Sequence, residues 1–291
     1  MSRLFDIITD STCDMAQEYY AENNVACAPL SFILDGVVYG NEEGEQMDEK
    51  VFYEKLRQGA MPVTSQINRT QAESYLRSSL SAQRDVLVLG FSSGLSGSVQ
   101  SFFQAAKDLA VEFPERKIIV VDSLCASMGE GLLLDYVIRK ADSGASIEET
   151  AAYAEELKPH ICHFFTVDNL FHLQRGGRVS KATAIVGTML KIKPVLHVDN
   201  DGHLIAIGKA MGRKKSIQAL VDHMAEERIP DADEPVFISH ADCAEDAEYL
   251  AGLVREKFGA ERRIVIHMIG AVIGSHAGCG TLALFFRGKQ R

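Results

Sequence analysis

The chain contains the run Asp85-Val-Leu-Val-Leu-Gly90, which continues through Phe91 into the small-residue segment Ser92-Ser-Gly-Leu-Ser-Gly-Ser98. A continuous apolar run of this length is typical of a strand that is buried on both faces. The apolar runs at residues 4–9 and 117–121 are likewise followed by small polar residues and then by a helical pattern. This alternation of strands and helices predicts a parallel sheet with helices on both faces.

The second half of the chain departs from this alternation. Two apolar segments, residues 192–198 and 203–207, flank Asp199-Asn-Asp-Gly202, which is a hairpin turn signal. An earlier Asp35-Gly36 pair predicts a first hairpin at the end of a strand over residues 25–34. The last Gly-rich segment is expected to lead into a final apolar helix.

These patterns predict an α/β fold of two domains. A helix is expected to begin at Ser146, because Glu149 stands at capping-box spacing, and the domain boundary is placed after it, near Lys158-Pro159. Residues 1–158 are predicted to form an N-terminal α/β domain with a parallel sheet and flanking helices. Residues 159–291 are predicted to form a C-terminal α/β domain with a mixed sheet that includes a hairpin.

The composition favours a cytoplasmic protein. Of the 291 residues, 46% are hydrophobic and 24% are charged, which is enough apolar material for two cores. No apolar run approaches the roughly 18 residues that a bilayer span requires, and Asp6 interrupts the N-terminus before a signal region can develop. The six cysteines stand singly and are expected to be reduced thiols. We expect no stable membrane insertion, although transient contact with a membrane is compatible with the sequence.

The charge of the chain is acidic overall and basic in one stretch. A net charge of −10 argues against nonspecific nucleic-acid binding, which needs Lys and Arg to neutralise phosphates. Between His172 and Lys215, however, the only acids are Asp199 and Asp201. The basic residues of this stretch are Arg175, Arg178, Lys181, Lys191, Lys193, Lys209, Arg213, Lys214 and Lys215. The stretch is expected to face an anion or an acidic partner; the alternative is an ordinary solvated surface.

Several common catalytic motifs fail in this chain. The segment Gly278-Cys-Gly-Thr-Leu-Ala283 resembles a dinucleotide-binding turn, but only eight residues follow it, too few for the second strand and the ribose-binding acid. Neither Gly-Lys pair is followed by Ser or Thr, so no phosphate-binding loop of the Walker type is present. Ser96 is one position out of register for a nucleophile elbow. In His160-Ile-Cys-His163 neighbouring strand residues point to opposite faces and no second ligand pair follows, so we expect neither a metal nor a cofactor.

Small hydroxyl residues gather in four segments of the chain. These segments are Thr9-Asp-Ser-Thr12, Thr64-Ser-Gln66, Ser92-Ser-Gly-Leu-Ser-Gly-Ser98 and Asp122-Ser123. Three of them follow predicted parallel strands, and ligands of open α/β sheets bind where the carboxyl ends of such strands converge. Hydroxyl groups and helix N-terminal amides at that edge suit an anion, whereas the alternative is that each group only caps its own helix. Asp10 and Asp122 would repel an anion and are expected to order the loops.

Seven stretches, in this order along the chain, carry a resemblance to a known family. They are Ile8-Thr-Asp-Ser-Thr12, Thr64-Ser-Gln66, Ser92-Ser-Gly-Leu-Ser-Gly97, Val121-Asp-Ser123 with Ala126-Ser-Met-Gly129, Leu173-Gln-Arg-Gly-Gly-Arg-Val179, Ile192-Lys-Pro194 and Ile273-Gly-Ser-His-Ala-Gly278. The chain resembles the DegV family, fatty-acid-binding proteins that serve as the binding subunit of bacterial fatty acid kinase. The resemblance implies a non-catalytic protein that holds a long-chain fatty acid in a tunnel between two domains.

The resemblance also implies roles for individual residues. Thr64 and Ser96 match the hydroxyl groups that hold the carboxylate, while Arg178 and His276 match groups beside the exposed head group, where the kinase subunit docks. Neighbouring loop residues are expected to support the head group: Asp10, Ser11, Ser65, Ser93, Gly94, Gly97 and Ser123. The chain departs from the family at Ile67-Asn68-Arg69, where Pro-Ser-Pro is usual, and at Cys279, where Pro is frequent. These departures affect loop rigidity and chain preference and leave both hydroxyl groups in place.

Elementary energetics agree with such a ligand. Burial of about 14 methylenes at roughly 0.8 kcal/mol each offers on the order of 11 kcal/mol before ordering costs, so the tail would supply the affinity. The carboxylate then needs donors, which hydroxyl groups and loop amides provide. Three alternatives stay open: a hydrolase or transferase with Ser96 as nucleophile and His276 as base, a ligand sensor without a kinase, and purely structural roles for Arg178 in a turn and His276 as a helix cap.

Overall fold

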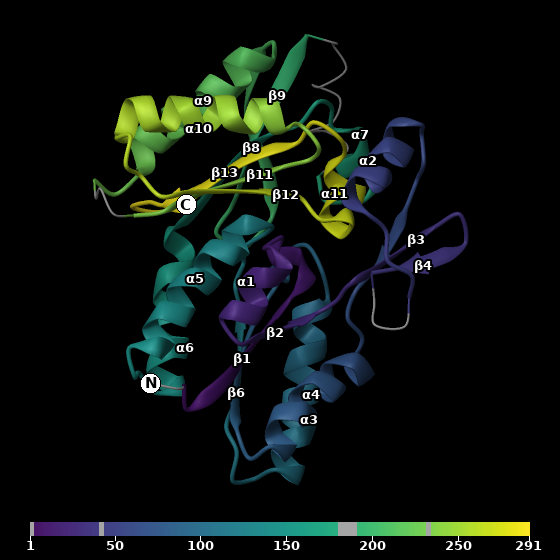
Figure 1. Ribbon diagram of the computed structural model, residues 1–291, viewed down its shortest axis with the longest axis vertical. Coiled ribbons are helices and arrows are strands. Elements are labelled where there is room, and N and C mark those ends of the chain that lie inside the picture. Colours follow the sequence, from purple (N-terminus) through teal and green to yellow (C-terminus); the bar gives the residue numbers. More distant parts are fainter. Residues whose placement is uncertain (1–2, 41–43, 180–190, 231–233) are drawn as a thin grey trace.

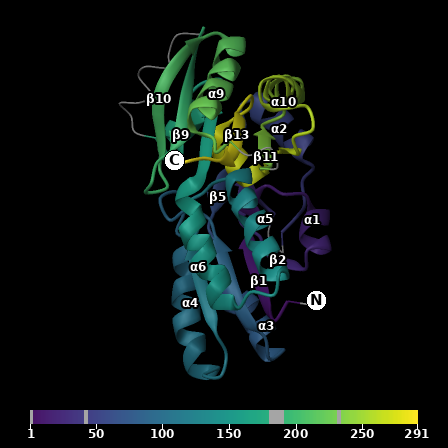
Figure 2. The ribbon, with the colours of Figure 1, turned by 90° about the vertical axis from the view of Figure 1, so that its left-hand side faces the viewer.

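The computed structural model describes residues 3–40, 44–179, 191–230 and 234–291. Lys181 of the basic stretch lies outside these residues. Two sheets lie one above the other along the long axis of the molecule, a parallel sheet at one end and a mixed sheet at the other (Figures 1 and 2). This arrangement confirms the predicted α/β fold class with its parallel and mixed sheets.

The parallel sheet has the strand order β2-β1-β6-β7. Its strands are β1 (Phe5–Asp10), β2 (Val25–Ala28), β6 (Asp85–Gly90) and β7 (Ile118–Asp122). Successive residues of a strand point to opposite faces, so Val86 and Val88 pack against one helical layer and Leu87 and Leu89 against the other. The first layer consists of α3 (Arg69–Ser81) and α4 (Ser98–Glu112), and the second of α5 (Met128–Asp142) and α6 (Ile147–Leu157) (Figure 1). Ser146 caps α6 and forms the predicted capping box with Glu149.

The mixed sheet has the order β10-β9-β8-β13-β11-β12, and only β11 and β12 pair in parallel. Its strands are β8 (Ile161–Thr166), β9 (Ile192–Val198), β10 (Leu204–Met211), β11 (Val236–His240), β12 (Ile264–Met268) and β13 (Leu282–Arg287). β9 and β10 form the hairpin that Asp199-Asn-Asp-Gly202 predicted. Two helices, α9 (Arg213–Glu227) and α10 (Ala244–Phe258), cover the outer face of the sheet (Figure 1).

A small antiparallel sheet, ordered β4-β3-β5, lies beside the junction of the two larger sheets (Figure 1). It consists of β3 (Ser31–Leu34), β4 (Val37–Tyr39) and β5 (Val63–Ser65). The Asp35-Gly36 hairpin is confirmed, with positive φ angles of 52° and 81° at its two residues. Helices α2 (Glu49–Arg57) and α11 (Ala271–Ala277) pack beside this sheet. The remaining short helices of the described chain are η1 (Ser11–Cys13), α1 (Gln17–Glu22), η2 (Lys158–His160) and α7 (Phe171–Arg175).

The prediction of one strand over residues 25–34 is wrong. The segment forms β2 and β3, which belong to different sheets, with Pro29 and Leu30 between them. Proline has no N–H to donate to a ladder, and the N–H of Leu30 donates instead to the Ser11 hydroxyl at 2.9 Å. The chain therefore leaves the parallel sheet at this point.

The predicted final helix is also wrong, because the last apolar run forms β13. This strand lies between β8 and β11 and pairs antiparallel with both. Its first five residues, Leu282 to Phe286, are buried. A short apolar run has no clear period, and only the pairing with strands distant in sequence distinguishes a strand from a helix here. Within the described ranges, every helix is too short or too polar to span a lipid bilayer.

Helix α5 joins the two large sheets into one core. Most of its residues are buried, including Leu132, Leu133 and Leu134. One side of the helix packs on the parallel sheet, and it also contacts β8, β11 and β13 of the mixed sheet. Phe165 and Phe285 of the mixed sheet belong to the same apolar cluster as Leu87 of the parallel sheet. The ends of the two sheets are thus held at a fixed separation.

Candidate functional site

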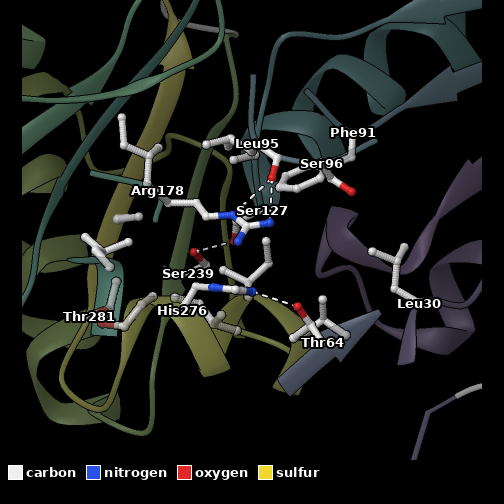
Figure 3. Close-up of a pocket in the computed structure, with 18 of the residues that line it drawn as sticks. Leu30, Thr64, Phe91, Leu95, Ser96, Ser127, Arg178, Ser239, His276 and Thr281 are labelled. Carbon is white, nitrogen blue, oxygen red and sulfur yellow. Dashed lines mark hydrogen bonds between the residues drawn. The ribbon is translucent and has the colours of Figure 1, made fainter. Parts of the chain in front are cut away.

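A cavity of about 530 Å³ lies where the parallel sheet, the mixed sheet and the small sheet meet (Figure 3). Its walls come from the chain after β6 and β7, from β5, from the inner face of β8 and β13, and from α11. The lining is mostly apolar and includes Phe91, Phe165, Ile273 and Phe285. Its volume and apolar character are those of a small-molecule binding site with a few polar groups to orient the ligand.

Thr64 and His276 are paired in the wall of this cavity. The Thr64 hydroxyl lies 2.8 Å from Nε2 of His276 (Figure 3), although the two residues are far apart in sequence. Burial and the nearby charges of Arg178 and Arg175 lower the pKa of His276 to about 4, so its ring is neutral at neutral pH. If Nε2 carries the ring proton and donates it to Thr64, the Thr64 hydroxyl keeps its own proton for a ligand.

The surroundings of His276 differ from the sequence prediction in one respect. His276 lies in the last turn of α11, so it does not cap the start of a helix, and its Nδ1 is buried with no hydrogen-bond partner in the described chain. A Cβ atom on Gly176 would lie only 2.1 Å from that Nδ1, so glycine at position 176 makes room for the ring. Thr64 lies in the edge strand β5, which the sequence placed among the loops.

Ser96 is held at the start of helix α4. Its hydroxyl accepts a hydrogen bond from the backbone N–H of Ser98 at 3.2 Å and lies 3.0 Å from the Ser98 hydroxyl. The Ser98 hydroxyl in turn accepts from the N–H of Ile67 at 3.2 Å. When Ser98 donates to Ser96, the proton of Ser96 remains available to a ligand, and the N-terminus of α4 adds a favourable dipole for an anion.

Arg178 brings a positive charge to the same cavity. Its guanidinium donates from Nε and Nη2 to the carbonyl of Leu95, at 3.1 and 2.9 Å (Figure 3), and from Nη1 to the carbonyl of Gly176. No acidic side chain of the described residues forms a salt bridge with Arg178, and its desolvation lowers its pKa. Two hydroxyl donors at one apolar cavity are suited to hold a carboxylate, and an unbalanced cation and a neutral imidazole beside them are suited to a phosphate or partner at the head group.

The predicted supporting residues divide into two groups. Ser65 lines the cavity beside Thr64. The others hold the loops behind it. Asp10 accepts from the N–H of Phe91 at 3.0 Å, Ser11 accepts from Leu30, Ser123 accepts from the N–H of Cys125 at 3.0 Å, and the N–H of Ser93 donates to Asp122 at 3.2 Å.

Two glycines of the same loop permit close packing. A Cβ atom on Gly94 would lie 2.8 Å from the carbonyl of Asp201 in the β9–β10 turn. A Cβ atom on Gly97 would lie 2.5 Å from the side chain of Gln66, immediately after β5. The Ser92 hydroxyl also donates to the carbonyl of Gly202 at 2.9 Å, so this loop touches elements of both halves of the chain.

Some cavity residues were missed by the sequence analysis. Ser127 and Ser239 line it, as does His163, which had been considered only as a metal ligand. The Ala126 N–H donates to Nε2 of His163 at 3.2 Å, and Nδ1 lies 2.8 Å from the carbonyl of Ile161. Both ring nitrogens are thereby engaged with backbone groups. The segment Ala126-Ser-Met-Gly129 was noticed in the sequence, but nothing in it pointed to the cavity.

The geometry does not form the nucleophile and base of the hydrolase alternative. Ser96 bonds to Ser98, and His276 bonds to Thr64. A catalytic base also needs a partner on its second nitrogen, and Nδ1 of His276 has none within the described chain.

Elsewhere, Asp199, Asp201 and His203 lie close enough to share a cation, but Asp199 already accepts from the N–H groups of Asp201 and His203, which is ordinary turn geometry.

The fold is that of an α/β protein with two large sheets and one small sheet, built around a ligand-sized apolar cavity. One part of this cavity is cationic and rich in hydroxyl groups. The family model described as uncharacterised protein of the DegV family matches residues 4–289. The chain belongs to the DegV family. A DegV domain-containing protein of Clostridium perfringens is 40% identical over 99% of this chain and 98% of its own, and one of Streptococcus pyogenes is 36% identical over 98% and 99%.

Solved structures show the same fold. A DegV family protein from Thermus thermophilus, described as binding fatty acid, has a TM-score of 0.86 and 31% identity, and the match covers 99% of this chain and 100% of that one. DegV of Bacillus subtilis, described as a fatty acid binding protein, has a TM-score of 0.83 and 29% identity, with the same coverage.

Proposed function

We propose that this protein binds a long-chain fatty acid in the cavity and presents its carboxylate to a fatty acid kinase, which phosphorylates it to an acyl phosphate. The observation that carries the proposal is the meeting of Thr64 and Ser96 in the wall of a mostly apolar cavity, with Arg178 beside them at the head group. The described relatives from Thermus thermophilus and Bacillus subtilis bind fatty acids, which supports the same ligand class here.

The two parts of the ligand have separate partners in this proposal. The acyl chain packs on aromatic and aliphatic side chains such as Phe165, Ile273 and Phe285, and its burial supplies most of the affinity. The carboxylate accepts hydrogen bonds from Thr64 and Ser96, whose own protons are free when Nε2 of His276 donates to Thr64 and the Ser98 hydroxyl donates to Ser96. Arg178 and His276 face the head group and the kinase. The protein itself performs no chemistry, and phosphate is transferred by the partner.

The first test is extraction of the ligand. Protein purified from a bacterial host and treated with organic solvent is expected to release about one fatty acid per chain, which mass spectrometry identifies. Protein that carries no fatty acid and also fails to take up added palmitate or oleate would contradict the proposed ligand.

The second test removes the two hydroxyl groups. A hydrogen bond to a charged group contributes about 1.5–3 kcal/mol, so Thr64→Ala with Ser96→Ala is expected to weaken fatty-acid affinity by at least roughly tenfold. The control is Ser74→Ala, on the exposed side of α3, which should bind as the parent does. Unchanged affinity in the double variant would show that the carboxylate lies elsewhere.

The third test addresses the partner. Arg178→Ala is expected to retain fatty-acid binding and to reduce acyl phosphate formation when a fatty acid kinase and ATP are added. Arg255, exposed on α10, provides a matched arginine whose replacement by alanine should leave both measurements unchanged. If Arg178→Ala abolishes binding itself, the arginine holds the carboxylate and the division of roles is wrong.

A further inference from the structure

Two buried serine hydroxyl groups interrupt the apolar lining of the cavity. Ser127, just before α5, and Ser239, in β11, are 5% and 0% exposed, and both line the cavity. Their hydroxyl oxygens lie 2.9 Å apart, and Figure 3 shows this bond among the lining residues. A fatty acid that carries only its carboxylate has no second polar group to match this pair.

The pair is anchored by a buried carboxyl group. The Ser127 hydroxyl lies 2.6 Å from Oδ2 of Asp14, and Oδ1 of Asp14 accepts from the N–H of Gly270 at 2.9 Å. Asp14 is only 4% exposed. Hydrogen bonds thus connect Asp14, after η1, to Ser127, before α5, and Ser127 to Ser239 in β11. This chain of hydrogen bonds ends at the cavity.

The backbone at Ser127 is held in an uncommon conformation to make this chain. Ser127 has φ 53° and ψ −145°, a region that residues with a side chain rarely adopt. Asp14 likewise has a positive φ of 51°. The surrounding structure therefore fixes these two side chains toward each other at a conformational cost.

A count of protons shows what the pair offers to the cavity. Burial raises the pKa of Asp14 well above its usual range, which favours the neutral acid. When the neutral acid donates to Ser127 and Ser127 donates to Ser239, the proton of Ser239 is left for the cavity. If Asp14 is ionised, Ser127 donates to it and Ser239 donates to Ser127, which leaves Ser239 only its acceptor lone pairs.

We infer that Ser127 and Ser239 form a second polar subsite within the cavity, which selects fatty acids bearing a hydroxyl group on the acyl chain. A ligand hydroxyl both donates and accepts, so it matches Ser239 in either arrangement of the protons. The inference rests on the proposed function, because it assumes that an acyl chain occupies the cavity, and it adds a preference that an unsubstituted chain would not satisfy.

The experiment compares matched pairs of ligands. Palmitate is paired with β-hydroxypalmitate and oleate with ricinoleate, so that each pair differs by one hydroxyl, near the carboxylate in the first and in mid-chain in the second. Each is titrated in competition with a fluorescent fatty-acid analogue on the intact protein freed of bound lipid. One hydrogen bond of about 1 to 1.5 kcal/mol predicts that one hydroxylated ligand binds several-fold to tenfold more tightly than its parent.

Ser239→Ala is the decisive variant, since it removes the hydroxyl at the cavity and adds no bulk. It is expected to bring the two members of each ligand pair to equal affinity. The control is Ser216→Ala on α9. Ser216 is fully buried, donates to the backbone carbonyl of Arg213 and is absent from the cavity wall, so this variant should keep the preference.

Two results would overturn the inference, and they differ from each other. If palmitate and oleate bind but hydroxylated and parent ligands have equal affinity, or the preference survives Ser239→Ala, the subsite is refuted and the proposed function stands. If none of the four ligands binds the parent protein, the proposed function fails together with the subsite.

Discussion

His276 is neutral because its surroundings disfavour a proton. The ring is desolvated, and the charges of Arg178 and Arg175 act in the same direction to lower its pKa to about 4. A neutral ring can donate to Thr64 through Nε2 without bringing a further charge into the cavity. The position of this ring depends on the absence of a side chain at residue 176.

Gly176→Ala tests that dependence at a single residue. Gly176 has φ −74° and ψ −7°, which alanine adopts freely, but its Cβ would lie 2.1 Å from Nδ1 of His276. The ring must move, and we expect a loss of about 1–3 kcal/mol in stability and weaker fatty-acid binding through Thr64. Thermal unfolding and ligand titration measure the two effects.

Gly177→Ala is the matched control for this substitution. Gly177 has a φ of 73°, and no atom lies within 4 Å of its added Cβ, so it changes the backbone preference alone. It should cost some stability and leave ligand affinity unchanged. If the two variants bind ligand equally, contact with His276 is not what Gly176 provides.

At the level of the element, the first turn of α5 contains a buried glutamate. Glu130 is fully buried, and its two carboxyl oxygens lie 3.2 Å from the hydroxyl groups of Thr9 and Thr12. The Thr12 hydroxyl also contacts Asp10, and since a hydroxyl has one proton, a protonated Glu130 can donate to Thr12 while Thr12 donates to Asp10. Burial, reinforced by the charge of Asp10, raises the pKa of Glu130 well above its usual range.

The sign of the resulting pH dependence follows from linkage. Above the pKa of an unfolded glutamate, the folded chain retains a proton on Glu130 that the unfolded chain has lost. The free energy of unfolding therefore falls as pH rises, by up to about 1.4 kcal/mol per pH unit. Glu130→Gln keeps the donor and the acceptor and removes the titration. We expect the variant to have a shallower slope of stability against pH above about pH 4.5 and to equal or exceed the parent at pH 7.

Chemical unfolding of both proteins across this range measures the difference in slope. Asp14 also has a raised pKa and contributes to both proteins, whereas Asp10 is coupled to Glu130 by its charge and through Thr12, so the difference in slope reports Glu130 together with its effect on Asp10. Parallel curves for the parent and Glu130→Gln would mean that Glu130 is ionised in the folded state.

The strands show which parts of the fold a sequence pattern can predict. Continuous apolar runs were sufficient to predict β1, β6 and β7, because burial on both faces leaves a local signal. The run Leu282 to Phe286 has the same signal, yet its identity as β13 depends on β8 and β11, which are distant in the chain. The β2–β3 break depends in part on the bond from Leu30 to Ser11, which no local pattern contains.

The candidate site shows the same limit. Thr64, Ser96, Arg178 and His276 could be named from motifs, and they line one cavity. The contact of Thr64 with His276 joins β5 to α11, and the pairing of Ser127 with Ser239 joins the segment before α5 to β11. Both contacts follow from how these elements pack and not from spacing along the chain.

At the scale of the whole molecule, the two halves depend on each other through α5. We propose a division into residues 1–158 and 159–291, since the parallel sheet lies in the first range and the mixed sheet in the second. Yet α5, which belongs to the first range, packs against β8, β11 and β13 of the second, and its Asp135 lies 3.2 Å from Arg263 beside β12.

A fragment of residues 1–158 is therefore expected not to fold as an independent unit. Removal of the second half would expose the face of α5 that contacts β8, β11 and β13, and an apolar surface of this kind favours association or a loosely packed state. We expect the fragment to bind the dye ANS, to lack near-ultraviolet circular dichroism and to melt without a cooperative transition, in contrast to the intact chain. Mixing with residues 159–291 should restore the cooperative transition and fatty-acid binding together, because the cavity has walls from both halves. A fragment that melts cooperatively on its own would show that the parallel sheet with its helices is already a complete domain and that α5 needs no cover from the mixed sheet.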